Sequence, residues 1–372
     1  MRKYITAFIL SGLASSALAG EFEYNYGLTA NGFYGYTDYA DKYRPLYKHN
    51  HTPVSTEITS SLGYRFDDET AVTLGIDGQI AGGKEVEDYN HGEWGENVYA
   101  TLETAYGELS AGQVYNAAYQ MAVGAPSVGA FRVNNSPITD FIANPNWQRH
   151  SRMTSYRTLN STYLNTDADA PKISYVTPEF FATKAAFSYT PDSYSKAGLI
   201  NKHSRYDNRS SYAAGLYNDL DLNYIEIESS LGYAYNHKNN QEISAGLSLY
   251  RKGWTLGGSY RKSFTSSNDY ALNLQESDDM PFYFDGYRRG QAFNVGLSYE
   301  IGPFKTGLTY FHAKSDKISA EDNIFTFANR FAFCKYAAIY LTAAYAEYKG
   351  DKKYNIDGNK GFATIGGLEL NF

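Results

Sequence analysis

Two groups of charged residues in this chain could act on one another across a water-filled space. The first lies within 116–171, a stretch without a regular strand pattern, and is mainly basic: Arg132, Arg149, Arg152 and Arg157, with Asp140, Asp167 and Asp169. The second is acidic and lies where polar and apolar residues alternate: Glu57, Asp77 and Glu103. Such opposite charges either pair to hold a segment in place or create a field that orients dipolar solutes and screens ions.

Other patterns that could bind a metal ion or support catalysis are weaker. His49 and His51 could supply half of a metal site, but no cysteine or clear carboxylate pattern accompanies them, and such histidines are usually just exposed. The acidic run 276–279 could bind divalent cations that bridge lipopolysaccharide, or it is a solvated loop. We find no nucleophile, phosphate-binding, dinucleotide or zinc motif. The sequence therefore predicts a protein that is not an enzyme and needs no metal and no cofactor.

The elements that would position these charges are strands. Runs of about ten residues with period-2 alternation recur along the chain, separated alternately by short and long connections. About sixteen strands are expected, at 22–36, 58–66, 72–80, 98–106, 109–115, 172–177, 183–189, 211–217, 224–235, 242–250, 254–264, 291–301, 305–312, 324–333, 337–348 and 361–372. An even number of strands with this rhythm is typical of transmembrane β-barrels, whereas a soluble sandwich or propeller would have long connections at both ends.

The last expected strand supports a closed barrel. Leu368, Leu370 and Phe372 fall on one face, and an apolar edge strand would invite aggregation in a soluble sheet. In a closed barrel this strand pairs with the first one, 22–36, and no edge remains. We therefore predict an all-β fold, a transmembrane antiparallel barrel. Its apolar side chains should face lipid, and its polar ones, including Glu57 and Asp77 in diagonal reach of each other, should face a wet interior.

The N-terminal residues predict export. Arg2 and Lys3 precede a short apolar run and the small-residue site Ala17-Leu18-Ala19, which is the pattern of a cleaved signal peptide at 1–19. The run is too short for a membrane anchor, which needs about 20 residues. Residues 20–372 contain no linker, so we expect one domain, and Cys334, the single cysteine, leaves no internal disulfide.

Composition fits this class. The mean hydropathy of −0.48 would suggest a soluble protein, but only every second strand residue of a barrel faces lipid. The 37 tyrosines are expected mainly in the girdles at the membrane interfaces. The net charge of −7, which becomes two units more negative without Arg2 and Lys3, favours cations inside a pore. The sequence has no basic patch that would indicate binding of nucleic acid.

Several segments together resemble the Gram-negative general diffusion porins, which are trimeric outer-membrane proteins. The resemblance covers nearly all of 20–372 and rests on the first strand 22–28, the hairpin 105–116, the turn 175–180, the long stretch after the fifth strand and the terminal Phe372. It implies an outer-membrane location in a Gram-negative bacterium, a homotrimer, contact with outer-membrane lipid and lipopolysaccharide, and assembly machinery that reads Leu368, Leu370 and Phe372.

The resemblance also implies that the third long loop, about 116–171, folds into the barrel and narrows it. Two departures change the expected chemistry. Gln113 replaces the usual arginine of the hairpin, and 136–141 is only a loose counterpart of the usual acidic loop sequence. The residues of this chain instead place the basic side on the loop and the acidic side on the wall. The predicted constriction comprises Arg132, Asp140, Arg149, Arg152, Arg157, Glu57, Asp77 and Glu103.

The sequence thus predicts a water-filled channel for passive diffusion of small hydrophilic solutes and ions, with a mild preference for cations. One alternative is a sugar-selective channel, because aromatic residues crowd the long loop: Tyr115, Tyr119, Phe131, Phe141, Trp147, Tyr156 and Tyr163. A second alternative is a structural or adhesin barrel with a plugged lumen. Conductance in a planar bilayer would separate an open channel from a plugged barrel.

Overall fold

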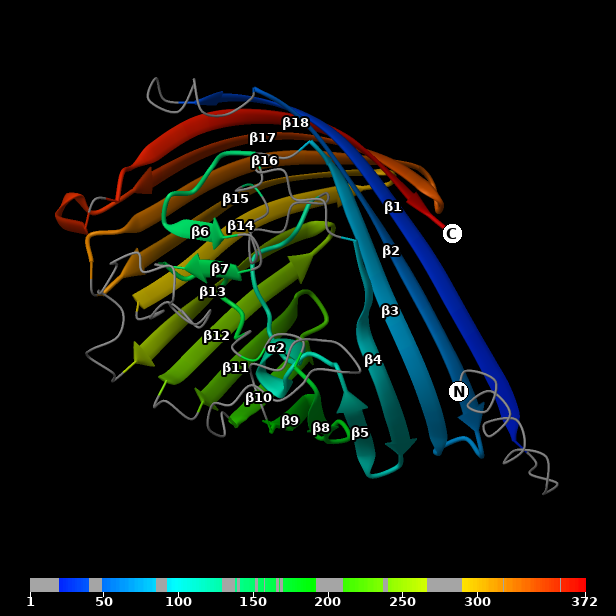
Figure 1. Ribbon diagram of the computed structural model, residues 1–372. Coiled ribbons are helices and arrows are strands. Elements are labelled where there is room, and N and C mark those ends of the chain that lie inside the picture. Colours follow the sequence, from blue (N-terminus) through cyan, green and yellow to red (C-terminus); the bar gives the residue numbers. More distant parts are fainter. Residues whose placement is uncertain are drawn as a thin grey trace, which may run out of the picture.

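The computed structural model describes residues 20–39, 49–84, 92–128, 138, 141–150, 153–156, 158–164, 167, 170–191, 210–236, 240–265, 290–316, 318–354 and 356–372. Within them, sixteen antiparallel strands close into one barrel, and a separate two-stranded hairpin lies inside its curve (Figure 1). No helix in this described part is long and apolar enough to cross a membrane. The predicted signal peptide, 1–19, lies outside the described residues.

The barrel runs in chain order. Its strands are β1 (Glu21–Tyr39), β2 (Asn50–Arg65), β3 (Ala71–Lys84), β4 (Gly92–Thr104), β5 (Gly107–Gly112), β8 (Lys172–Val176), β9 (Thr183–Thr190), β10 (Ser211–Asp221), β11 (Glu226–Asn236), β12 (Asn240–Arg251), β13 (Trp254–Thr265), β14 (Gly290–Ile301), β15 (Phe304–Ser315), β16 (Glu321–Cys334), β17 (Ala337–Lys349) and β18 (Asn359–Asn371). Between β5 and β8 lie a short helix, α2 (Ala117–Gln120), and the hairpin of β6 (Trp147–His150) and β7 (Met153–Tyr156). A single turn, η2 (Lys352–Tyr354), precedes β18.

Period-2 alternation sorts the side chains by face, as the sequence predicts. In β15, Leu308 is 59% exposed on the outer face, whereas its neighbour Gly307 is buried on the inner face. The same alternation holds in β10, where Leu216 is exposed and Gly215 is buried. On these two strands the exposed apolar residues therefore lie on the outer face, and the residues between them point inward.

The first and last strands close the barrel, which confirms the predicted seam. The register runs from Thr29 opposite Asn371 to Tyr39 opposite Gly361. Beyond it, Leu28 and Phe372 exchange two backbone hydrogen bonds of 2.8 and 2.9 Å. The Phe372 ring is 62% exposed and stacks on Tyr336, with 6.5 Å between ring centroids. The terminal aromatic thus completes the sheet and belongs to its outer apolar face.

Short connections gather at one end of the barrel, called here the turn end, and long ones at the other, the loop end (Figure 1). The end expected for the strand 211–217 is wrong, because β10 continues to Asp221 and the connection therefore begins later than 218. Asn218 and Asp219 do not reverse the chain, because the Asn218 amide donates to Ala182 and Thr183 across the β9–β10 pair and keeps the strand in register. Strand pairing overrides the turn preference of these residue types. The reversal comes later, at 222–225, where Asn223 adopts a positive φ of 65°.

The main apolar core lies on the inner side of the wall. Phe141, Ile142 and Leu159 of the stretch between β5 and β8 pack on inward-facing residues of β14 to β18, among them Phe311 and Ile365. All five side chains are at most 1% exposed. An empty barrel of this size would enclose water, so this contact between loop and wall supplies the apolar burial that a soluble protein obtains from its centre.

Candidate functional site

A row of glycines on the inner wall contacts α2 and the residues that directly follow it. One inward-facing glycine comes from each of six consecutive strands, β10 to β15: Gly215, Gly232, Gly246, Gly257, Gly296 and Gly307. Residues 117–128, called here the inner segment, pass over them in order. A Cβ added at Gly215 would lie 2.7 Å from the Ala117 carbonyl oxygen, and one at Gly257 would lie 2.6 Å from that of Gly124. Side chains there would push the segment off the wall.

The start of the inner segment is fixed by Asn116, the N-cap of α2. Its side-chain oxygen accepts from the Tyr119 backbone N–H at 2.9 Å, and its amide donates to Asp167 at 2.6 Å. Asp167 also accepts from the Thr190 hydroxyl at 2.7 Å and lies 3.9 Å from the Lys172 ammonium. Asp167 is one of the loop charges that the sequence indicated, and it anchors the loop to the wall. Its side chain is 2% exposed and does not face the open lumen.

Polar side chains of the wall satisfy the backbone of the inner segment. The Ser230 hydroxyl accepts from the Val123 N–H at 2.9 Å, and the Ser248 hydroxyl donates to the Gly124 carbonyl at 2.9 Å. Asn294 accepts from the Ala125 N–H at 3.2 Å. Buried backbone groups without such partners would be costly, so these contacts replace the hydrogen bonds of a sheet and fix the path of the segment.

The returning part of the loop is bound by a buried ion pair. Arg261 of β13 and Glu242 of β12 lie 2.5 Å apart with fully buried side chains. The same guanidinium donates to the carbonyl oxygens of Tyr163 at 2.7 Å and Ser161 at 3.2 Å. Further along, the carboxylate of Asp322 accepts from Asn146 at 2.7 Å and from the Thr158 hydroxyl. The described loop residues are thus tied to β8–β18 by charged and polar anchors.

Glu57 and Asp77 lie outside this packing, on β2 and β3. Glu57 is opposite Gln79 and Asp77 is opposite Thr59, so the two carboxylates are diagonal neighbours on the inner face, as predicted. Glu57 is exposed and Asp77 is half-buried. Neither forms an ion pair with any residue that the structure describes. Together they place negative charge on the wall that faces the anchored loop across the barrel.

Glu103, the third carboxylate predicted on the wall, does not lie near Glu57 and Asp77. Glu103 of β4 lies opposite Glu108 of β5 near the turn end, six residues along β4 from Asn97, which pairs with Asp77. At roughly 3.3 Å per residue this is about 20 Å away. Of the predicted loop charges, Arg132, Asp140, Arg152 and Arg157 lie outside the described residues, and of Arg149 only the backbone, in β6, is described.

Sequence reasoning missed an acidic group at the turn end of β10 and β11. Carboxylate oxygens of Asp219, Glu226 and Glu228 lie within 4.8 Å of one another, and Glu228 accepts from the hydroxyls of Tyr217 and Tyr250 at 2.7 and 2.6 Å. Acidic residues at alternate positions 226 and 228 could have indicated a shared face. Their cross-strand partner Asp219 is not assignable from the sequence, because the expected strand 211–217 ends before it.

A family model described as Gram-negative porin matches residues 6–351. The chain belongs to the Gram-negative porin family. A relative from Rickettsia bellii (strain RML369-C), described as an uncharacterized protein, is 23% identical over 332 residues, which cover 73% of this chain and 75% of the relative.

Solved structures show the same fold. An anion-selective porin from Comamonas acidovorans is 14% identical with a TM-score of 0.61, over 95% of this chain and 100% of that one. Salmonella typhi OmpF, in complex with daunomycin, is 12% identical with a TM-score of 0.63, over 94% and 97% of the two chains. These likenesses concern the fold alone. Family and barrel together indicate an outer-membrane β-barrel and a channel protein.

Proposed function

We propose that this porin is a passive, water-filled channel for small hydrophilic solutes and ions, with a mild preference for cations, in the outer membrane of a Gram-negative bacterium. Solutes enter at the loop end and leave at the turn end. The narrowing lies between the anchored loop and the wall of β2 and β3. The loop is held to the opposite wall by the six inward-facing glycines of β10 to β15, called here the glycine seat, and by its buried anchors. This supports a permanent narrowing rather than a plug.

The observation that carries this proposal is the Glu57–Asp77 pair. Its two inward-facing carboxylates lie side by side without a described cationic partner, so they hold negative charge in the aqueous path. Low-dielectric walls focus such a field and raise the local concentration of cations. The net charge of −7 acts in the same direction.

Reversal potentials in a planar bilayer test it. Across a KCl gradient the wild-type protein should give a potential of the sign for cation preference, and the double variant Glu57→Gln/Asp77→Asn should move it toward zero. Glu69→Gln is the matched control, since Glu69 is exposed in the β2–β3 turn outside the lumen. An unchanged potential in the double variant contradicts the proposed role of the pair. A wild-type protein that does not conduct contradicts the channel itself and favours the plugged barrel.

The predicted assembly belongs to the same proposal. We propose a homotrimer whose last strand, with Leu368, Leu370 and Phe372 on its outer face, is read by the outer-membrane assembly machinery. The exposed, outward-pointing Leu368 and Phe372 support this role. Crosslinking of purified outer membranes should give a ladder that ends at three subunits. A ladder that ends at one or two contradicts the trimer.

A sugar-selective channel is the second candidate, and one observation favours it. Tyr115, which is 52% exposed, stacks on Tyr119 with ring centroids 4.3 Å apart at an interplanar angle of 13°, and Tyr163 meets Tyr119 edge to face. Such rings can stack on pyranose faces. An oligosaccharide should then block single-channel current in a concentration-dependent way, and Tyr115→Ala should relieve the block, whereas Tyr106→Ala in an exposed turn should not. Absence of block by the wild-type protein excludes this candidate.

A further inference from the structure

A polar hollow lies at the turn end, on the rim where the lumen opens. Its volume is about 900 Å³. It lies among three connections between strands: 222–225, 252–253 and 302–303. Two of its lining residues, Glu226 of β11 and Tyr250 of β12, are cross-strand neighbours. Tyr250 is two residues beyond Ser248, whose hydroxyl binds the inner segment, so this pair faces the lumen.

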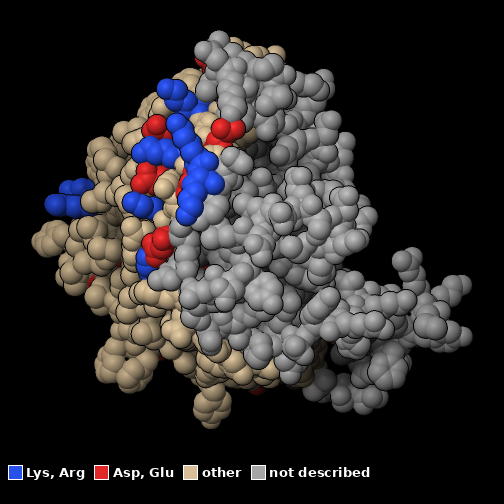
Figure 2. All heavy atoms as spheres, turned by 60° about the vertical axis from the view of Figure 1, so that its left-hand side comes forward, with Lys and Arg blue, Asp and Glu red and all other residues tan. Residues whose placement is uncertain are grey.

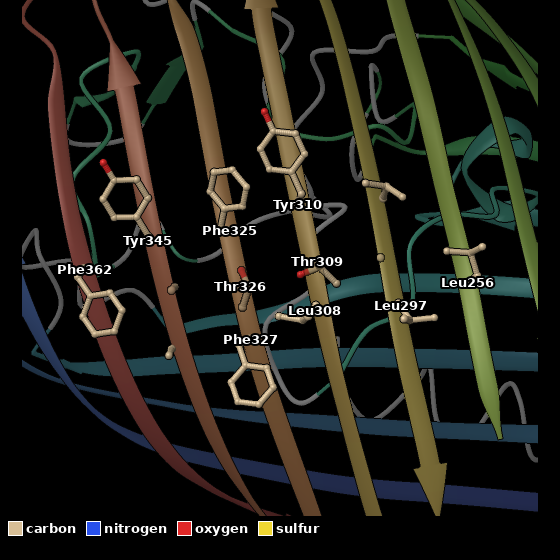
Figure 3. Close-up of a pocket in the computed structure, with 14 residues that line it drawn as sticks. Leu256, Leu297, Leu308, Thr309, Tyr310, Phe325, Thr326, Phe327, Tyr345 and Phe362 are labelled. Carbon is tan, nitrogen blue, oxygen red and sulfur yellow. The ribbon is translucent and has the colours of Figure 1, made fainter.

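The chemistry of this hollow differs from that of the outer face. Figure 3 shows a hollow on the outer side of β13 to β18, which is lined mostly by apolar and aromatic side chains such as Leu308, Phe327 and Tyr345. The hollow at the turn end is lined by three acidic, three basic and three aromatic residues. Such a lining suits a polar solute that carries charges of both signs.

The charges of the hollow remain available to a ligand. At the loop end, Figure 2 shows basic and acidic side chains gathered in one area, and Glu321 there pairs with Lys349 at 2.9 Å and with Lys314 at 3.6 Å. In the hollow, Glu226 and Lys252 are both exposed. Neither forms an ion pair with another residue in the described part of the chain.

The acidic side of the hollow can hold an ammonium group. Carboxylate oxygens of Asp219, Glu226 and Glu228 lie within 4.8 Å of one another on the inner face of β10 and β11. The hydroxyls of Tyr217 and Tyr250 fix Glu228, and Glu226 lines the hollow itself. An ammonium group has three N–H donors, so it can contact more than one of these carboxylates.

The basic side of the hollow lies on the connection between β12 and β13. Arg251 ends β12, and Lys252 follows it with a positive φ of 47° in the two-residue turn. Both are exposed, and both can donate to a carboxylate. Tyr224 and Trp254 line the same hollow and are also exposed, so their rings offer flat surfaces to an apolar side chain.

The separation of the two sides matches a short peptide. Glu226 is opposite Tyr250, and Lys252 is two residues beyond Tyr250. One strand spacing and two residues along the strand place the backbones of Glu226 and Lys252 about 8 Å apart. An extended tripeptide covers about 10 Å between its ends. A free amino acid carries both charges on one carbon, so it reaches only one side.

We propose that this hollow binds short peptides with free ends. The N-terminal ammonium contacts Glu226, the C-terminal carboxylate contacts Lys252 and Arg251, and the middle of the peptide lies against Tyr224 and Trp254. The equal number of acidic and basic residues around the hollow suits a zwitterion of no net charge. The proposal rests on the proposed function and deepens it, because it names peptides as a class of solute that leaves at the turn end.

Ligand-observed NMR titration of the purified protein in detergent tests the site. The ligand is alanyl-tyrosyl-alanine with free ends, and it is compared with its N-acetylated form, its C-amidated form and free alanine. The variants are Glu226→Gln and Lys252→Gln. Their matched controls are Glu69→Gln and Lys335→Gln, which lie in other exposed turns at the same end of the barrel.

Wild type and both controls should bind the free tripeptide more tightly than either blocked form or alanine. Glu226→Gln and Lys252→Gln should each weaken that binding about 2- to 5-fold, as expected for one exposed charge pair. Glu226→Gln should no longer distinguish the N-acetylated form, and Lys252→Gln should no longer distinguish the C-amidated form. Equal affinity for free and blocked peptides in the wild-type protein overturns the proposal, as does equal affinity in variants and controls.

Single-channel conductance without peptide tests the channel separately. A protein that binds the tripeptide as described but does not conduct refutes the proposed channel and leaves the peptide site standing. A protein that conducts but binds no tripeptide refutes the peptide site alone.

Discussion

Arg261 and Glu242 form an ion pair of 2.5 Å in which neither side chain is exposed to solvent. They come from neighbouring strands, β13 and β12, and stand between the barrel wall and the returning loop. The arginine also donates to the carbonyl oxygens of Ser161 and Tyr163. The pair therefore neutralises its own buried charge and fixes the loop to the wall at the same time.

Breaking this pair should destabilise the protein strongly. Arg261→Met leaves the Glu242 carboxylate buried without its partner, which costs about 3–5 kcal/mol. The double variant Arg261→Met/Glu242→Leu should recover most of that loss, because an apolar pair of similar volume avoids the uncompensated charge. Heat unfolding followed by circular dichroism in detergent measures both. Equal melting temperatures for wild type and Arg261→Met would show that the pair does not stabilise the fold.

The glycine seat should set the width of the lumen. Gly246→Ala places a Cβ against the Val123 carbonyl, so the inner segment must move away from the wall. We expect a lower single-channel conductance and a loss of about 1–3 kcal/mol in stability, as for other overpacked sites. Gly366→Ala is the control, because its added Cβ would meet no atom closer than 4.0 Å. If both variants conduct like wild type, the seat does not position the segment.

The loop arginines should reduce the preference for cations that Glu57 and Asp77 on the wall produce. Changing Arg149 or Arg152 to Glu reverses a charge of the loop that we propose forms the constriction with Glu57 and Asp77, so selectivity for cations should rise. Reversal potentials across a KCl gradient measure this for each variant. Unchanged selectivity in both would remove the electrostatic role and favour the other interpretation, in which these arginines only pair with wall carboxylates to hold the loop.

Phe372 should matter for assembly more than for transport. Its backbone closes the seam with Leu28 and its ring stacks on Tyr336 on the outer face, whereas the inner segment lies on the inner face of β10 to β15. Deletion of Phe372 should lower the amount of folded protein in the outer membrane, scored by heat-modifiable gel mobility. Channels that do form should keep the wild-type conductance. A reduced conductance at normal yield would contradict this division of roles.

Most of the barrel follows from local sequence, because a period-2 pattern repeats within each strand and the turns between strands are short. That pattern predicted the strand number, the closure of 22–36 on the last strand and the inward position of Glu57 and Asp77. It failed at Asn218 and Asp219, where hydrogen bonds to β9, distant in sequence, keep the strand going.

Other features depend on register between strands, which no single segment encodes. Six glycines that look like ordinary strand residues become one seat only because six strands align them under the inner segment. Arg261 reaches Glu242 only through the β12–β13 pairing, and Lys314, Glu321 and Lys349 form one outer row only through two further pairings. The sequence by itself determined that the chain closes into a barrel with a polar interior. The tertiary structure decided where the loop lies and which charges meet, because lateral hydrogen bonding brings together residues that are far apart in the chain.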